Sequence, residues 1–301
     1  MKNNIAVCVP TFHEKDHVFL FLESLNSLQY NFKEVLIVNG DYGDETSDLI
    51  NECKSYMNLN IKEIPGKKNE LWSGTVNRGL NKILIEYGSN IDILLCNIDI
   101  IFEDSTIDNL LNSSKILGRR NIIGAVGIYK DKVFCSGVKV KSWLFPIRNL
   151  HPFENILREE LDNCDYAYVD FLPCRCIFIP SDVNLLIDSI SYKKLPHYHA
   201  DYEFTYRLKR EGAKLIIDPS ARIHLDMENT GISVFNDKFD AVIFFKNLFN
   251  IKHVSNIKYR INFVLLTFPW YAKLTALIVY LLKTLTELCL GLIYSIKNYK
   301  K

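Results

Sequence analysis

An asparagine and an aspartate, Asn97 and Asp99, stand directly after a short apolar run at residues 93–96. Such a run is typical of a buried strand. Because ligands of α/β sheets bind just outside the carboxyl ends of the strands, a carboxylate at this place could hold a divalent cation and, through it, a phosphate. The pattern equally fits an aspartate that begins a turn, since Asp is common where strands end. This segment alone leaves both interpretations open.

A second acidic segment, residues 195–212, joins a polar, aromatic loop to a helix that is expected to end at Gly212. Asp201 and Glu203 lie at the head of that helix. A carboxylate there can accept a proton from an attacking hydroxyl and so act as a general base. Asp201 could also be the N-cap, with Glu203 a favourable acid of the first turn, and these roles do not exclude the catalytic one.

The elements expected around these segments alternate between strand and helix through the first half of the chain. Repeated βα units predict an α/β, Rossmann-like fold with a mixed, mostly parallel sheet covered by helices on both faces. The predicted strands are 5–9, 34–38, 60–64, 93–96, 121–128, 132–140, 169–179, 214–217 and 221–224. The predicted helices are 18–28, 46–57, 73–87, one that starts at 180–182 and one that ends at 212.

Bulk properties are those of a globular protein of 301 residues, 48% hydrophobic and 24% charged. Its eight cysteines show no zinc-site spacing, and several lie in apolar runs, where a free cysteine behaves as a small core residue. The N-terminus leads straight into a strand without the pattern of a secretory signal, so we expect a cytosolic body with reduced cysteines. We expect no nucleic-acid partner.

The charge is unevenly distributed along the chain. From Lys246 to the end, nine Lys or Arg face one acid, Glu287, so this tail carries +8 and the remainder carries −7 within a total of +1. Residues 261–296 are mostly apolar, but Lys283 and Glu287 interrupt them, and uninterrupted runs such as 274–282 are too short to span a bilayer. A basic, apolar tail on an acidic body points to an anionic membrane surface as a partner.

Three arrangements of this tail remain open. Two helices that lie in the membrane interface, with lysines reaching the headgroups, fit the interrupted apolar pattern. Helices packed on the body as ordinary core are the second possibility, and a tilted span or hairpin is the third. We therefore predict a body at residues 1–232 and a helical, membrane-associating region at residues 233–301.

Several polar loops fall at the carboxyl ends of predicted strands, where a nucleotide could bind. Phe12 could stack on a base, and Asn39 or Asp41 could hydrogen-bond the base or the ribose. The tract 72–79, which includes Asn77, predicts a helix N-terminus with glycines and a cation near a diphosphate. Each signal is weak alone, since turns favour these residues, but their common edge indicates a nucleotide site.

The order of these motifs resembles that of the family 2 glycosyltransferases, which have the GT-A nucleotide-sugar-binding fold. The resemblance covers residues 5–232. It rests on Val7–Phe12, Leu36–Asp41 with Asp44 and Thr46, Asn77–Leu80, Asn97–Asp99, Val169–Pro173, and Asp201–Phe204 with Arg207. Within the family the chain is most similar to the rhamnosyltransferase-type enzymes of bacterial surface polysaccharide assembly, on the segments Leu195–Tyr198 and Asn229–Gly231.

The resemblance implies a role for each matched residue. Asp201 would be the catalytic base, Asp99 the closing acid of the metal and diphosphate signature, and His224 a further metal contact, although a lone histidine is as often structural. The cofactor would be Mg²⁺ or Mn²⁺. The nucleotide would be lined by Pro10, Thr11, Phe12, Glu14, Asn39, Asp41, Asn77 and Asn97, and the acceptor side by Arg175 and Glu203.

The chain departs from the family pattern at three places. Asn39 replaces the usual acid after the second strand, although its amide oxygen can still accept from an imide N–H. Asn97 replaces the first acid of the metal signature, so the site has one carboxylate fewer and its dependence on a metal is an open question. Cys174 and Cys176 flank Arg175 where relatives often have glycines, and they should reshape the acceptor pocket.

The resemblance implies an inverting hexosyl or deoxyhexosyl transfer, in which Asp201 deprotonates an acceptor hydroxyl that attacks the anomeric carbon. The donor would be a UDP- or dTDP-sugar, dTDP-rhamnose included. The acceptor would be a lipid-linked glycan in cell-surface polysaccharide synthesis, at the cytoplasmic face of the membrane, where the enzyme would be peripheral or monotopic. The alternatives are a non-catalytic, membrane-tethered binding module and a sugar nucleotidyltransferase, although residues 10–15 contain no glycine for the basic loop of the latter.

Overall fold

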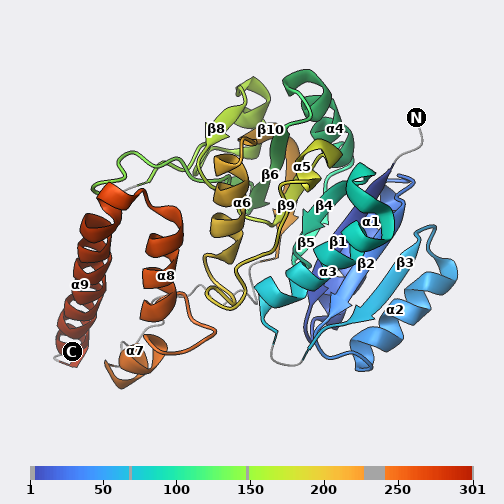
Figure 1. Ribbon diagram of the computed structural model, residues 1–301. Coiled ribbons are helices and arrows are strands. Elements are labelled where there is room, and N and C mark those ends of the chain that lie inside the picture. Colours follow the sequence, from blue (N-terminus) through green and yellow to red (C-terminus); the bar gives the residue numbers. More distant parts are fainter. Residues whose placement is uncertain (1–3, 68–69, 147–148, 227–240, 300–301) are drawn as a thin grey trace.

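Helices cover both faces of one mixed sheet, and a group of C-terminal helices lies to one side of this body (Figure 1). The computed structural model describes residues 4–67, 70–146, 149–226 and 241–299, of which 241 and 292–299 are described by their backbone alone. This is the α/β fold with a C-terminal helical region that the sequence predicts.

The bounds of the elements are as follows. The strands are β1 (Ile5–Thr11), β2 (Glu34–Asn39), β3 (Ile61–Pro65), β4 (Asp92–Cys96), β5 (Ile100–Phe102), β6 (Asn121–Tyr129), β7 (Lys132–Cys135), β8 (Ala167–Val169), β9 (Cys176–Ile179) and β10 (Lys214–Leu225). The α-helices are α1 (Lys15–Ser27), α2 (Glu45–Tyr56), α3 (Trp72–Tyr87), α4 (Thr106–Leu117), α5 (Ser181–Asn184), α6 (Ala200–Arg210), α7 (Ala241–Asn247), α8 (Ile257–Thr267) and α9 (Lys273–Tyr299).

The sheet has ten strands among the described residues, in the order β3-β2-β1-β4-β9-β6-β10-β5, with β7 on β6 and β8 on β10. β1 to β4 pair in parallel, as β6 does with β10. β9 runs antiparallel between β4 and β6, with Cys176 opposite Cys96. The carboxyl ends of β1, β2 and β4 therefore meet at one edge, beside the amino end of β9.

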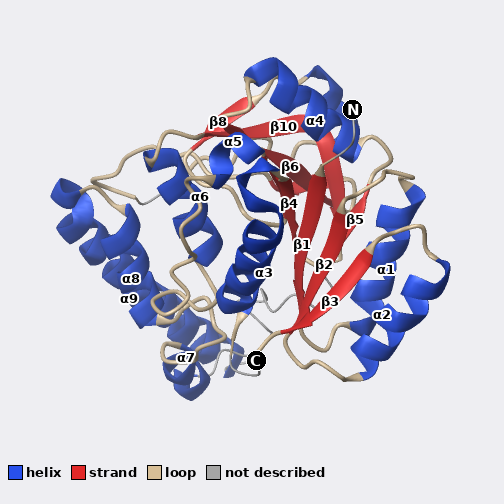
Figure 2. Cartoon of the chain, turned by 45° about the vertical axis from the view of Figure 1, so that its right-hand side comes forward, coloured by secondary structure: helices blue, strands red, loops and turns tan. Residues whose placement is uncertain are grey.

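Two apolar cores hold the helices on the sheet. On one face, α3 packs on β1 and β2, and α6 and α8 extend this layer with side chains such as Phe204 and Phe263. On the other face, α1, α2 and α4 bury Phe21, Ile50 and Leu110. Figure 2 shows α3 on the opposite side of the strands from α1 and α2. Because both faces are covered, β1 and β2 are buried at every position, which explains their continuous apolar sequences.

The single strand predicted at residues 169–179 is wrong, because the chain leaves the sheet between β8 and β9. Asp170 accepts hydrogen bonds from the backbone after β7 (2.7 Å) and from Lys209 Nζ (2.6 Å), which turn this segment aside. Pro173 has no N–H to donate to a neighbouring strand. The break places Arg175 directly before β9, at the edge where the polar loops meet.

Two other strand predictions need correction. The strand predicted at 132–140 ends at Cys135, and Gly137 turns the chain with a φ of +85°. The strands predicted at 214–217 and 221–224 are one strand, β10, whose register with β6 shifts after Asp218. There the Asp218 carboxylate accepts the backbone N–H two residues on (2.8 Å), a local turn that leaves both halves in the sheet.

Neither β5 nor α4 is among the predicted elements. β5 has three residues and pairs antiparallel with the end of β10, so its formation depends on a strand far along the chain. α4 does carry the helical signal in sequence, since Ile107 and Leu110 are buried on one face. β5 matters for the site because it fixes the residue before it, Asp99, whose carbonyl accepts the N–H of Asp226 (3.1 Å).

The C-terminal helices α8 and α9 form a hairpin with a turn at Pro269 (Figure 1). Arg260 of α8 donates to Thr284 Oγ1 (2.8 Å) and pairs with Glu287 (3.3 Å) of α9. The one acid of the basic tail is therefore neutralised inside the hairpin, and α9 continues through it.

One helix in the described part of the chain has the length and composition to cross a membrane: residues Trp270–Gly291, 22 residues with a mean hydropathy of 1.6. The sequence predicts apolar runs that are too short to span a bilayer. The helix is nevertheless long enough, because it continues through Lys283 and Glu287. The predicted boundary between residues 232 and 233 and the segment Asn229–Gly231 lie outside the described residues, so the two-domain division stays a prediction.

Gly79→Ala should destabilise the fold, because a Cβ atom there would lie 2.5 Å from Cys8 Sγ and 3.0 Å from Val38 Cγ2 in the core. We expect the free energy of unfolding, measured by urea denaturation, to fall by about 1–3 kcal/mol despite the higher helix propensity of alanine. Gly74→Ala is the control in the same helix, since its Cβ would meet only the side chain of Glu70, which can move. Wild-type stability of Gly79→Ala would contradict close packing of α3 on the sheet.

Candidate active site

An exposed aromatic ring and a polar edge lie together after β1 and β2. Phe12 is 39% exposed, and the ring of His13 contacts it edge-on, with centroids 4.3 Å apart. His13 also bridges two carboxylates of the loop after β2, with Nε2 3.0 Å from Asp41 Oδ2 and Nδ1 3.2 Å from Asp44 Oδ2. An aromatic face beside donors and acceptors is suited to a nucleobase. We call this group the nucleotide corner.

The residues on either side of Phe12 in the sequence have different exposures. Pro10 and Thr11 are buried at the end of β1, so they form the buried base of the nucleotide corner. Glu14 precedes α1 and accepts the N–H of Phe12 (3.3 Å). Burial raises the pKa of Glu14, and the negative charge of Asp99 contributes in the same direction. Glu14 therefore lies between the nucleotide corner and the end of β4.

Asn39 is fully buried, and its side chain is bonded within the protein. Its Nδ2 lies within hydrogen-bonding distance of Asp44 Oδ1 (3.0 Å), Ser47 Oγ (3.2 Å) and Glu63 Oε1 (3.0 Å), and its Oδ1 accepts the N–H of Asp41 (3.1 Å). The amide oxygen that the sequence assigns to a base imide is thus used by the loop. In this geometry Asn39 positions Asp41, and Asp41 is the residue exposed to a ligand.

The Asp99 carboxylate after β4 is paired with Arg175. Arg175 Nη1 lies 2.8 Å from Asp99 Oδ2, and the two side chains are only 15% and 13% exposed. Burial opposes the charge of Arg175, but Asp99, Cys135 and Asp201 together outweigh it and raise the pKa of the guanidinium. Asp99 Oδ1 is also buried, without a hydrogen-bond partner in the described part of the chain. Asn97 is held by Trp72, whose Nε1 donates to Asn97 Oδ1 (2.8 Å).

The expected metal ligands are not brought together. His224 on β10 is 45% exposed, and its Nε2 lies 3.0 Å from Glu103 Oε1. Among the described residues, no group of three His, Cys, Asp or Glu side chains is arranged to hold an ion. A dication at Asp99 would also lie beside the guanidinium of Arg175, which would repel it. These side chains, as arranged, do not fit a divalent cation shared by Asp99 and His224.

Asp201 is the second residue of α6, and the N-cap is His199 in a left-handed conformation with a φ of +68°. The capping role that the sequence allows for Asp201 is therefore wrong. Burial raises the pKa of Asp201 to about 6, against the lowering effects of the Tyr202 N–H and the charge of Arg175. A carboxylate with this pKa is largely ionised at neutral pH and basic enough to assist deprotonation of a hydroxyl.

Side chains of residues 72–79 hold α3 against neighbouring parts of the protein. Asn77 Oδ1 accepts a backbone N–H from the loop before α6 (3.0 Å), and Arg78 pairs with Glu70 (2.7 Å). Gly79 faces the core against β1 and β2. The part of the tract that remains at the site is the beginning of α3, where Trp72 holds the end of β4.

Of the two residues expected on the acceptor side, Arg175 lies at the site and Glu203 does not. Glu203 is 3% exposed within α6, and its Oε1 lies 3.0 Å from Arg207 Nε. Arg207 also donates to the carbonyl of Ser189, so this pair fastens α6 to the preceding loop. Arg175, in contrast, acts electrostatically on both Asp99 and Asp201 and links the two ends of the site.

Lys252 is a site residue that the sequence did not single out. Its Nζ lies 5.4 Å from the centroid of the Phe12 ring, so the turn after α7 reaches the nucleotide corner. Burial lowers the pKa of His197, and the positive charge of Lys252 lowers it further. The sequence gives no role to His13 either, because its partners Asp41 and Asp44 come from another loop. The basic excess of the tail was the only signal for Lys252.

The family comparison matches just over half of the chain. Residues 6–165 match the family model described as Glycosyl transferase family 2. No curated protein matches the sequence. The match includes β1 to β7, and with them the nucleotide corner and Asp99. The narrower similarity to rhamnosyltransferase-type enzymes stays a prediction.

Several solved structures share the fold. The mannosyltransferase PcManGT from Pyrobaculum calidifontis, in complex with GDP-Man and Mn²⁺, aligns with a TM-score of 0.57 and 11% identity over 97% of this chain and 73% of its own. S. aureus TarS 1–349 aligns with a TM-score of 0.54 and 11% identity over 92% and 70%. GalNAc-T7 with UDP, GalNAc and Mn²⁺ gives 0.55 and 12% over 74% and 43%, so this chain spans less than half of that protein. These likenesses confirm the GT-A fold.

Asp201→Asn should raise the stability of the protein near neutral pH. The pKa of Asp201, raised from 3.8 to about 6, means that the folded state binds this proton more tightly than the unfolded chain does. That stabilisation is complete below the unfolded pKa and is lost as the pH rises through about 6. Over this pH interval the free energy of unfolding of the wild type should therefore fall by up to about 3 kcal/mol relative to that of the variant.

Urea unfolding between about pH 4 and pH 8 measures this difference. Asp104→Asn, at an exposed position, is the control and should show no such pH-dependent gain. A difference between wild type and Asp201→Asn that stays constant over this range would contradict the raised pKa.

Proposed function

Because the chain belongs to glycosyl transferase family 2, we propose that it transfers a hexosyl or deoxyhexosyl group from a nucleotide-diphosphate donor to an acceptor hydroxyl, with inversion at the anomeric carbon. The observation that carries this proposal is the carboxylate of Asp201, whose pKa of about 6 suits a general base. It stands across Arg175 from Asp99, and Phe12 lies further along the same edge of the sheet.

The proposed reaction uses Asp201 as the group that takes the proton. The acceptor oxygen attacks the anomeric carbon as Asp201 accepts its hydrogen, and the bond between that carbon and the diphosphate oxygen breaks. The products are the glycosylated acceptor and a nucleoside diphosphate. The beginning of α3, at the positive end of the helix dipole, favours the negative charge of the leaving group.

For the donor we propose a UDP- or dTDP-sugar, dTDP-rhamnose included. The ring of Phe12 provides a stacking face, and Asp41 and His13 provide polar groups beside it. UDP is bound in the GalNAc-T7 structure and in a TarS 1–349 structure, and GDP-Man in that of PcManGT. These ligands support a nucleotide at this edge and leave the choice of base to experiment.

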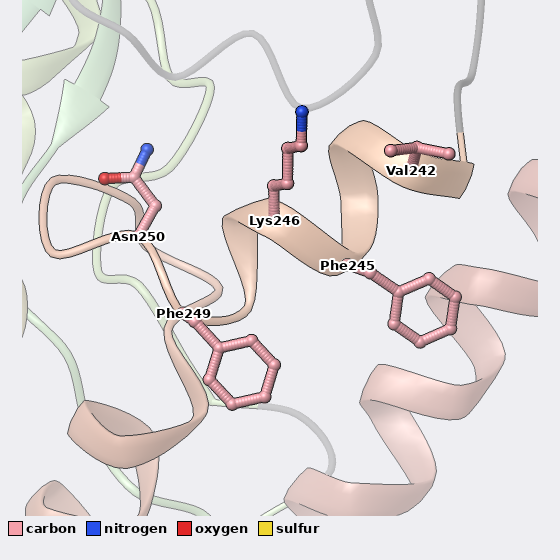
Figure 3. Close-up of a pocket in the computed structure, with 5 residues that line it drawn as sticks. All are labelled: Val242, Phe245, Lys246, Phe249 and Asn250. Carbon is pink, nitrogen blue, oxygen red and sulfur yellow. The ribbon is translucent and has the colours of Figure 1, made fainter.

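For the acceptor we propose a lipid-linked glycan of cell-surface polysaccharide synthesis, reached from the cytoplasmic face of the membrane. The support is the apolar surface of the C-terminal helices, since contiguous exposed apolar side chains mark interaction sites. Trp270 is 84% exposed and Leu274 is 70% exposed. Phe245 on α7 and Phe249 in the turn after it point to one side and Lys246 to the other, around a hollow of about 590 Å³ (Figure 3). Apolar groups backed by lysines suit a membrane interface.

Asp201→Asn should lower the rate of transfer by about 10²–10⁴-fold, because it removes the general base, and should leave nucleoside-diphosphate binding intact. The assay follows nucleoside diphosphate released from a panel of UDP-, dTDP- and GDP-sugars with hydroxyl acceptors. Asp104→Asn is the control at an exposed position. Full activity of Asp201→Asn would remove Asp201 as the base.

Two further outcomes of this assay would favour the alternative functions. Donor binding without turnover by the wild type would favour a non-catalytic binding module, for which the asparagines at positions 39 and 97 are the sequence argument. Release of pyrophosphate from a nucleoside triphosphate and a sugar phosphate would favour a nucleotidyltransferase.

Leu274→Glu combined with Leu281→Glu should reduce flotation of the full chain with vesicles of anionic phospholipid by at least about tenfold, since each leucine contributes about 1.5–3 kcal/mol when buried. Both side chains are exposed on α9, at 70% and 51%. Leu185→Glu is the matched control, because Leu185 is 82% exposed outside the C-terminal helices. Unchanged flotation of the double variant would contradict membrane contact through this face.

A further inference from the structure

The diphosphate of a nucleotide-sugar donor needs positive charge beside it, and the side chains expected to hold a divalent cation have other partners. Asn97 is bonded to Trp72, His224 is paired with Glu103, and Asp99 is paired with Arg175. The positive charge has to come from elsewhere in the chain.

Arg175 is the first source of that charge. It enters from the amino end of β9, which lies beside the carboxyl end of β4, and the N–H of Asn97 donates to its carbonyl (2.9 Å). Only one of its guanidinium nitrogens, Nη1, is bonded to Asp99. A guanidinium has five N–H donors, so this pairing leaves others that can bind phosphate oxygens.

Lys252 is the second source. Its ammonium lies 5.4 Å from the centre of the Phe12 ring, at the nucleotide corner, and no carboxylate in the described part of the chain forms an ion pair with it. The turn that carries it is held by two hydrogen bonds: the Lys252 N–H donates to Asn250 Oδ1 (2.9 Å), and Asn256 Nδ2 donates to the Asn250 carbonyl (3.0 Å). The lysine is therefore presented from a bonded turn, with its charge still available to a ligand.

We propose that this enzyme neutralises the diphosphate of its donor with Arg175 and Lys252 and does not require a divalent cation. This inference rests on the proposed function. Arg175, Lys252 and Asp99 together carry one net positive charge, which equals that of a divalent ion bound to a single carboxylate. Arg175 lies beside Asp99 at the end of β4 and Lys252 beside Phe12 at the end of β1, so both can reach phosphate groups of one donor whose base stacks on Phe12. Lys252 contributes a point charge, and Arg175 a planar set of donors.

The arrangement also gives a role to the buried oxygen of Asp99 that has no partner. Arg175 holds Asp99 Oδ2, which leaves the buried Oδ1 without a partner among the described residues and able to accept a hydrogen bond. A hydroxyl of the donor can donate to it, which would satisfy a buried polar atom that is costly to leave unpaired.

Isothermal titration calorimetry of the full chain with UDP, dTDP and GDP tests this proposal in excess EDTA and in saturating MnCl₂. We expect the nucleotide that binds best to have the same Kd in both conditions, within about twofold. Lys252→Met should weaken its binding at least about tenfold, the effect of one lost charge-assisted hydrogen bond. The loss should be smaller for the matching nucleoside monophosphate, which separates a contact with the diphosphate from a contact with the base.

Lys258→Met is the matched control, since Lys258 is exposed on α8 in the same C-terminal region, and it should bind like the wild type. Mn²⁺ that tightens binding more than about twofold would overturn the proposal, as would equal affinities of Lys252→Met and Lys258→Met. An equal loss for the monophosphate and the diphosphate would also overturn it, because Lys252 would then serve the base. If none of the three nucleotides binds in either condition, the proposed function itself fails.

Discussion

The ion pair between Asp99 and Arg175 organises the site, because it joins the carboxyl end of β4 to the amino end of β9 where these strands pair antiparallel. Burying two charges is unfavourable unless they are well paired, and removing one partner leaves the other uncompensated. Here the 2.8 Å contact supplies the pairing. The pair fixes Asp99 at the end of β4 and brings a guanidinium toward Asp201, so one interaction sets the geometry of both ends of the candidate site.

The carboxylates around this pair are held in states that cost the fold stability. Burial raises the pKa values of Glu14 and Asp201, and the charge of Arg175 only partly compensates the burial of Asp201. A structure selected for stability alone would not leave a carboxyl with a pKa of about 6 in the first turn of a helix, where the N–H groups favour its charge. Such strain is common at catalytic sites and is a physical reason to place the chemistry at Asp201.

Much of the first half of the fold could be predicted from the sequence, because its elements are decided by local signals. β1, β2 and β4 are continuous apolar runs, and Asp44 caps α2 with its side chain, as its position before Thr46 suggests. Where long-range contacts decide the conformation, prediction failed. β5 exists only because β10 pairs with it, and the strand predicted at 169–179 breaks because Asp170 bonds to Lys209 on α6.

The same distinction between local signals and long-range contacts explains which features of the candidate site the sequence could predict. Asp99 and Asp201 follow local motifs, and both could be chosen from the sequence. The Asn39 side chain is hydrogen-bonded to Glu63 from β3, and the Asn97 side chain is hydrogen-bonded to Trp72 from α3. Neither partner is implied by the motif in which the asparagine stands. Lys252 and Phe12 are far apart in the sequence, so no local pattern encodes their contact.

The C-terminal helices α8 and α9 differ in how much of their apolar surface is buried. α8 is ordinary core: Phe263 packs against Phe171 and stacks on His199, with ring centroids 4.8 Å apart in the second contact. α9 keeps a largely exposed apolar face beyond it. Because His199 directly precedes α6, the helix that carries Asp201, the inner helix of the hairpin braces the proposed general base, and the outer helix leaves its apolar face exposed. The turn before α8 brings Lys252 to the nucleotide corner. A surface that binds α9 would therefore be connected through α8 to both Asp201 and the nucleotide corner, so the C-terminal helices contribute to the candidate site as well as to the exposed apolar surface.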